Sequence, residues 1–191
     1  MLEKKRPILF LLAIITYSCG CVQTSLTEGE LQWVSSYKKG EQIVFKSDRG
    51  NVDTLVVIDK IESFTNPDCN RFGVGKTQQN FVTVKLKPKA CKKRSYCDIL
   101  IDIRKEKEDE EAYLFLRVYG LEYAFGHGAE NDTLNLQKEK KFGSVYYFQE
   151  GINCKGYGLN HPKSFRYNKN NGLISYEKKD GELFELYKKI E

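Results

Sequence analysis

The chain has 191 residues, a formal net charge of +5 at pH 7 and an aromatic content of 13%. Its basic and acidic residues are interspersed, so the charge does not indicate a nucleic-acid-binding protein. A chain of this length is typical of one domain that buries its own hydrophobic core.

A short apolar segment with a basic flank opens the chain. Residues 8–16 follow Lys4, Lys5 and Arg6, and the segment is much shorter than the about 20 apolar residues that a membrane-spanning helix needs. A positive cluster followed by a short apolar segment is typical of a secretory signal peptide. We therefore expect this segment to direct export.

The apolar segment is followed by two cysteines, Cys19 and Cys21. Ser18-Cys19 and Gly20-Cys21 both resemble the end of a bacterial lipobox, in which the cysteine is acylated and becomes the first residue of the mature chain. Several acyl chains hold a protein stably at a membrane. The resemblance implies a lipoprotein signal peptide over 1–18, an anchor and tether over 19–32 and one β-rich globular domain over 33–191. The spacing from the apolar segment favours Cys19 as the lipid anchor, and Cys21 is the alternative.

Four further cysteines follow the leader. An exported chain with four cysteines is expected to form two disulfides, and the sequence leaves their connectivity open. The even number of these cysteines favours Cys21 as the anchor, because all four can then pair. If Cys19 is acylated instead, Cys21 is left over as a fifth cysteine. Their spacing lacks the paired or clustered ligands of a zinc site, so we expect no metal. The four residues are Cys69, Cys91, Cys97 and Cys154.

From Gln42 onward, apolar residues alternate with a period of two, which predicts β-strands. The alternation covers 43–45, 55–61, 82–86, 99–103 and 112–119. Both faces of 112–119 are apolar, which predicts a central strand. Turn residues at 48–51, 171–172 and 180–181 predict hairpins, and no segment shows a long helical stripe. Together, these strands and hairpins predict a mostly β domain. Its form is expected to be a single antiparallel β-sandwich or partly open β-barrel of about nine to ten strands in meander order.

Two motifs resemble ligand sites but lack the required context. Residues 72–77 contain Gly-Lys-Thr, but Asn70 occupies the position where a phosphate-binding loop has glycine. A predicted strand follows rather than a helix, so we expect no nucleotide. His127 lies near Glu130 and Asp132, but this glycine-rich segment predicts a polar loop rather than a metal site.

No catalytic set is found in the sequence. Cys154 with His161 is one candidate for a thiol catalyst, but a disulfide is the simpler fate of Cys154 outside the cytosol. The serine-hydrolase and zinc-protease motifs are missing as well. We therefore predict a protein that is not an enzyme and needs no cofactor.

Aromatic residues are concentrated in the second half of the chain. Most are expected in the core, because aromatic side chains are a main filling of such cores. The alternative is a groove lined by one aromatic face, which would bind a lipid, a glycan or a peptide. The candidate residues for this face are Tyr113, Phe115 and Tyr119.

The two ends of the globular part resemble small envelope lipoproteins of Bacteroidota. Residues 31–55 have a tryptophan, a Tyr-x-x-Gly-x-x-Ile-x-Phe strand, a turn and Asp-Thr, and residues 167–187 resemble the final hairpins of these proteins. The resemblance implies an envelope lipoprotein with a β-rich domain and no assigned activity. Surface-exported members often carry an acidic run after the cysteine. Residues 20–24 contain none, which favours the periplasmic face of the outer membrane.

Our leading expectation is therefore a non-enzymatic, membrane-anchored lipoprotein that binds a protein partner or a small apolar ligand. One alternative is a lipid carrier or chaperone with an open barrel. Another is an unrecognised cell-wall or glycan hydrolase, which for glycosidase chemistry needs two carboxylates within about 10 Å. An immunity-type protein that blocks a toxin is equally compatible with the sequence. Neither nucleic acid nor nucleotide is expected as a partner.

Overall fold

The computed structural model describes residues 21–68, 77–89, 91, 97–126 and 134–191. These residues form fourteen strands and one helix, α2 (Glu28–Ser35). The strands of the first half are β1 (Val22–Gln23), β2 (Gln42–Ser47), β3 (Val52–Phe64), β4 (Thr77–Gln78), β5 (Asn80–Pro88), β6 (Ile99–Lys105), β7 (Tyr113–Val118) and β8 (Leu121–Phe125). Those of the second half are β9 (Leu136–Glu139), β10 (Gly143–Gln149), β11 (Lys155–Gly156), β12 (Ser164–Asn168), β13 (Gly172–Glu177) and β14 (Leu183–Ile190).

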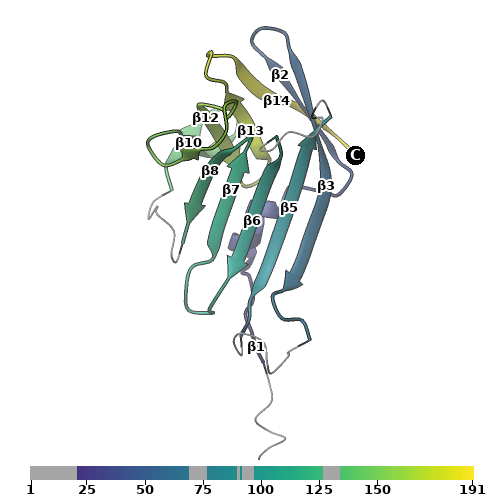
Figure 1. The fold of residues 1–191 in the computed structure, drawn as a ribbon, viewed down its shortest axis with the longest axis vertical. Helices are drawn as coiled ribbons and strands as arrows, with labels where there is room; N and C mark the ends of the chain where they lie inside the picture. The colour runs from purple at the N-terminus through teal and green to yellow at the C-terminus, as the bar shows by residue number, and fades with distance from the viewer. Residues whose placement is uncertain (1–20, 69–76, 90, 92–96, 127–133) are drawn as a thin grey trace, which may run out of the picture.

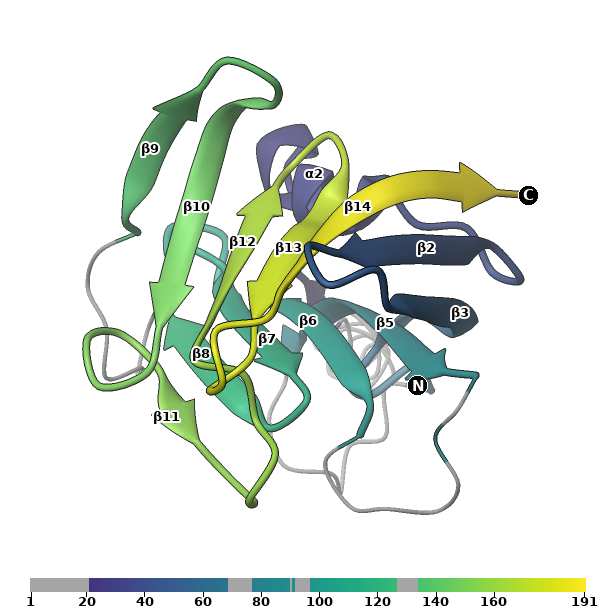
Figure 2. The same cartoon turned by 90° about the horizontal axis from the view of Figure 1, so that it is seen from above.

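Twelve of the described strands form one sheet, in the order β11-β8-β7-β6-β5-β3-β2-β14-β13-β12-β10-β9. Neighbouring strands of this sheet are antiparallel, and most are joined by hairpins. The sheet curls into an open half-barrel that is seen from the side in Figure 1 and from above in Figure 2. The predicted mostly β class is confirmed, with the partly open barrel as its form and with more strands than expected.

The inner face of the half-barrel carries the hydrophobic core. Side chains alternate between the two faces of a strand, and on β6 the buried residues Ile99, Ile101 and Ile103 point toward α2. The partner positions on β5 and β7 carry valine and leucine side chains in the same cluster. Phe148 and Phe165 of the second half stack with ring centroids 4.6 Å apart. The core is therefore one cluster built from both halves of the sheet.

Helix α2 lies against this inner face. It begins with a capping box, because the Thr27 hydroxyl accepts from the Glu30 backbone N–H and the Glu30 carboxylate accepts from the Thr27 backbone N–H. Trp33 and Val34 are its buried residues. The Trp33 ring lies 4.6 Å from the ring of Tyr146 and 5.4 Å from that of Tyr167. The helix covers apolar surface that the curled sheet alone leaves open.

Both ends of α2 are fastened to the sheet. The Glu30 carboxylate accepts a hydrogen bond of 2.8 Å from Lys105 Nζ, whose side chain is only 6% exposed. Burial alone would raise the pKa of Glu30, but the bonds from Lys105 and Thr27 outweigh it and lower that pKa. At the other end, Lys60 Nζ donates to the carbonyls of Val34 and Tyr37, each at 3.0 Å. A cation at this end also complements the helix dipole.

The segment expected as a tether is largely part of the folded domain. Val22 and Gln23 pair with Thr77 and Gln78, and the buried Thr24 hydroxyl donates to the Lys105 carbonyl at 2.7 Å. The predicted tether over 19–32 is therefore folded from Val22 onward. In Figure 1, β1 lies at the opposite end of the molecule from the C-terminus. Among the described residues, no helix has both the length and the apolar character needed to cross a bilayer.

Candidate binding surface

Two of the three predicted aromatic residues share the outer face of the sheet. Tyr113 and Phe115 alternate with the inward-facing Leu114 and Leu116 on β7, so they point away from α2 and stay half-buried. Tyr119 does not join them. It lies in the β7–β8 turn with a φ of 51°, and its hydroxyl donates to Asp53. Tyr113 and Phe115 therefore share one face of β7, and Tyr119 lies apart from them.

A hollow of about 460 Å³ opens on the outer face of β5, β6 and β7. We call it the β5–β7 hollow. Cross-strand pairing builds it, because Arg104 lies opposite Tyr113, and Asp102 lies between Thr83 and Phe115. Its lining residues are Thr83, Leu100, Asp102, Arg104, Glu106, Tyr113 and Phe115.

The floor of the β5–β7 hollow is polar and fixed by internal bonds. The Asp102 residue is 8% exposed. Its carboxylate accepts from the Thr83 hydroxyl and, at 3.1 Å, from Arg104 Nη2. The Arg104 Nε–H is buried and has no hydrogen-bond partner within the described part of the chain. A buried donor without an acceptor is costly, so the Arg104 side chain that lines this hollow has a hydrogen bond still to make.

A second hollow, of about 400 Å³, lies beside the first at the edge of β8. We call it the loop hollow, because the 150–161 loop forms one of its walls. Phe115 lines both hollows. The loop hollow is lined by Phe115, Glu122, Tyr123, Ala124, Gly151, Ile152, Asn153, Cys154, Lys155 and Tyr157.

The 150–161 loop displays large apolar side chains to solvent. Ile152 is 70% exposed, Tyr157 42% and Leu159 95%. A single exposed apolar side chain is ordinary, whereas a group of them marks an interaction surface. The sequence pattern did not predict this group. The sequence does contain one indication of an interaction surface, because these apolar residues interrupt a stretch rich in glycine and asparagine.

The backbone of this loop is held by many hydrogen bonds. The N–H groups of Ile152 and Cys154 donate to the Gln149 carbonyl, and the N–H of Tyr157 donates to the Gly120 carbonyl at 2.7 Å. The buried His161 bonds the Glu150 carboxylate through Nε2 at 2.6 Å and the Gly158 carbonyl through Nδ1 at 2.9 Å. The exposed apolar side chains therefore project from an ordered backbone.

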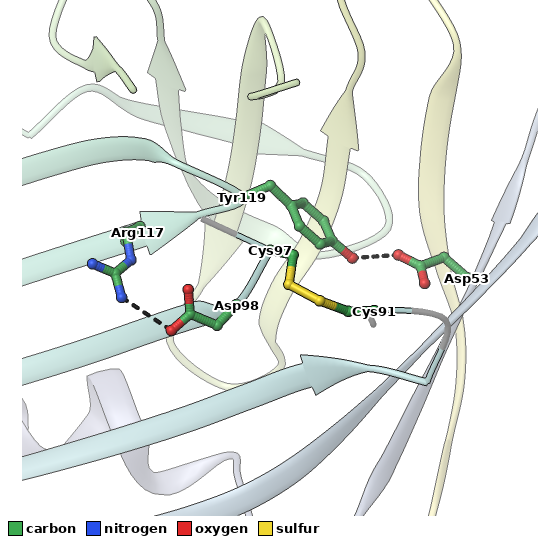
Figure 3. The surroundings of a disulfide bond; sticks show 6 residues. All are labelled: Asp53, Cys91, Cys97, Asp98, Arg117 and Tyr119. Atoms are coloured by element: carbon green, nitrogen blue, oxygen red, sulfur yellow. Dashed lines mark hydrogen bonds and ion pairs between the residues drawn. A yellow bond between two sulfur atoms is a disulfide. The ribbon is translucent and has the colours of Figure 1, made fainter. Parts of the chain in front are cut away.

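Polar contacts tie the β7–β8 turn to its surroundings, and Figure 3 also shows the Cys91–Cys97 disulfide of the β5–β6 connection. Tyr119 and Tyr176 both donate to Asp53 Oδ2, Tyr176 at 2.7 Å. Burial raises the pKa of both phenols, and the nearby carboxylate adds to this rise. Beside them, Arg117 Nη2 bonds Asp98 at 3.0 Å. This cluster joins β3, the β7–β8 turn and β13, and its role is to stabilise the fold.

The cysteines follow the prediction only in part. Cys91 and Cys97 form a disulfide, and Cys69 lies outside the described residues. Cys154 is a free, buried thiol, so its expected pairing is wrong. Burial raises the pKa of this thiol to about 12. Cys21 is itself disulfide-bonded.

The catalytic candidate His161 is bonded to other groups of the 150–161 loop. Both ring nitrogens of His161 are engaged by Gly158 and Glu150, which leaves neither of them to activate the protonated thiol of Cys154. Within the described part of the chain, no three His, Cys, Asp or Glu side chains form a metal-binding group. Residues 72–76, His127 and Cys19 lie outside the described residues, whereas Thr77 begins β4.

In comparisons with known proteins, no family model, no curated protein and no solved structure matches the chain.

Proposed function

We propose that this chain is a lipid-anchored protein of the bacterial cell envelope that binds a partner protein and catalyses no reaction. The observation that carries the proposal is the exposure of Ile152, Tyr157 and Leu159 on a hydrogen-bonded loop. A partner can cover these side chains without first ordering the loop, which lowers the entropic cost of binding.

The loop hollow supplies the place for an anchoring side chain of the partner. Phe115, Tyr123 and Ala124 contribute apolar or aromatic lining, and Glu122 and Lys155 contribute charged lining. An apolar centre with a polar rim is the arrangement of protein–protein interfaces. Binding energy in such interfaces concentrates on a few side chains that fill pockets.

Two features support binding on the outside of the half-barrel over carriage of a lipid within it. Trp33 and Tyr37 of the α2 region are 5% and 1% exposed, and they pack into the inner face. The Tyr37 hydroxyl accepts from the Leu173 N–H at 2.7 Å, which fixes it there. Any lipid would have to displace these contacts.

The disulfide of Cys21 argues against Cys21 as the anchor, and the spacing from the apolar segment favours Cys19. The sulfur of an acylated lipobox cysteine carries the lipid, so a cysteine in a disulfide cannot serve. The anchor is tested by the intact mass of the protein expressed with its own leader, followed by peptide mapping. We expect a lipid-modified N-terminal Cys19, and an unmodified N-terminus would contradict the anchor.

The partner surface is tested by site-specific photo-crosslinking in envelope fractions. A crosslinker placed at position 159 is expected to yield a discrete adduct, and Ile152→Asp is expected to abolish it. The matched control is Val52→Asp, which changes an apolar side chain that is 60% exposed on another strand. An adduct that survives Ile152→Asp, or that Val52→Asp removes equally, would overturn the proposed surface.

A further inference from the structure

The β5–β7 hollow has hydrogen-bonding groups left over after its internal bonds are counted. The Arg104 Nε–H is buried without a partner among the described residues. Asp102 accepts two bonds, whereas a carboxylate has about four acceptor positions. Glu106 adds a second carboxylate to the wall. A ligand that fits must therefore both accept and donate hydrogen bonds.

The same hollow also presents aromatic surface. Tyr113 and Phe115 stand side by side on β7 and are each partly exposed. Because burial raises the pKa of the Tyr113 phenol, this ring stays neutral at physiological pH. The ligand must therefore also have an apolar face that can lie against these rings.

The charges exclude the simplest ligands. One arginine faces two carboxylates, so a phosphate or sulfate group would meet net repulsion. A purely apolar ligand would leave Arg104 Nε without a partner and would cover the unused acceptor positions of Asp102, which disfavours its binding. A sugar ring meets all the requirements, because its hydroxyls donate and accept while its C–H face is apolar.

We propose that the β5–β7 hollow binds a segment of a neutral saccharide chain, with the sugar against Tyr113 and Phe115 and its hydroxyls bonded to Asp102 and Arg104. The volume of about 460 Å³ lies within the usual range of ligand pockets. This inference goes beyond the partner surface at the 150–161 loop and rests on different residues, apart from the shared Phe115.

The test is calorimetric titration of the full chain, produced with its own leader, in a detergent without a sugar headgroup. The probes are maltohexaose, cellohexaose, mannohexaose and chitohexaose. We expect at least one of them to bind with a dissociation constant of about 1 mM or tighter. We expect Tyr113→Ala and Arg104→Lys each to weaken that binding about tenfold. Arg104→Lys keeps the charge and removes the Nε donor.

The matched control is Tyr187→Ala, which removes a tyrosine that is 56% exposed on β14. Circular dichroism checks that each variant is folded, and both hollow variants change outer-face residues that are partly exposed. The proposal is overturned if none of the four oligosaccharides binds, or if Tyr187→Ala weakens binding as much as the hollow variants do. Ile152→Asp separates the two proposals, because it should abolish the crosslink and leave oligosaccharide binding unchanged.

Discussion

Gly156 is the residue at which the 150–161 loop has no room for a side chain. A Cβ at this position would stand 2.0 Å from His161 Nε2, the atom that bonds Glu150. We expect Gly156→Ala to displace the imidazole, break this bond and lower the melting temperature. The matched control is Gly29→Ala, where a Cβ meets nothing within 4 Å. In the helical position of Gly29, alanine should be neutral or stabilising by up to about 1 kcal/mol. Thermal unfolding of both variants checks this, and equal melting temperatures would contradict the tight contact.

Glu182 makes the stability of the molecule depend on pH. Hydrogen bonds from Asn51, Lys178 and Ser47 lower the pKa of Glu182 from its ordinary 4.5 to about 2. The bonds from Asn51 and Lys178 measure 2.6 and 2.8 Å. Because the folded-state pKa is the lower one, the unfolded chain binds more protons as the pH falls below 4.5. The stabilisation is therefore complete above that pH and is lost progressively toward about pH 2.

The test compares the melting temperatures of the wild type and Glu182→Gln at neutral pH and through this acidic window. We expect the wild type to be the more stable at neutral pH and its advantage to shrink as the pH falls toward 2. Glu185→Gln, an exposed carboxylate on the neighbouring strand β14, controls for the loss of one negative charge. An advantage that stays constant over the whole window would show that these hydrogen bonds do not favour the ionised form.

At the scale of elements, α2 depends on its N-terminal cap. Removing the Thr27 hydroxyl leaves the Glu30 backbone N–H without its acceptor, which costs about 1 kcal/mol. In a chain of this size, Thr27→Ala should lower the melting temperature by about 2–4 °C. The control is Ser35→Ala in the last turn, where the hydroxyl donates to the Gln32 carbonyl and caps no N–H of the first turn. Calorimetry checks both variants, and equal losses would mean that the capping box contributes nothing specific.

The alternation of apolar residues made the long strands predictable, because each has one buried face. The same signal is weak in short elements. Helix α2 has eight residues and buries only Trp33 and Val34, so no helical stripe could be recognised. Strand β9 is almost entirely exposed, with Leu136 at 52%. Helices and strands that bury few side chains show no periodic pattern of apolar residues in the sequence.

The candidate surface was predictable only where it lies on a regular strand. Alternation placed Tyr113 and Phe115 together, but it ends with β7 at Val118, and Tyr119 turns away with positive φ. The exposure of Ile152 and Leu159 depends on a loop path that only the fold determines. The free thiol of Cys154 likewise depends on distances in space, which the number of cysteines does not contain.

At the scale of the whole molecule, α2 joins the two halves of the sheet. It bonds the first half through Glu30 and Lys105. It bonds the second half through the Trp33 carbonyl, which accepts from Tyr167. Besides α2, the halves meet through the β2–β14 pairing and through Tyr123 and Phe148, whose ring centroids are 4.6 Å apart. Because each half depends on α2 to cover its inner face, we expect the described domain to unfold in one step.

Trp33 provides the test, since it is the one tryptophan in the sequence and it is 5% exposed. Its fluorescence reports the docking of α2, whereas far-ultraviolet circular dichroism reports the sheet. The two denaturation curves should coincide, which is the criterion for a two-state transition. Tyr37→Phe removes the acceptor of the Leu173 N–H, which should cost about 1–3 kcal/mol. The midpoints of both curves should then shift together. A fluorescence change at lower denaturant than the loss of strand signal would mean that α2 docks on a half-barrel that is stable without it.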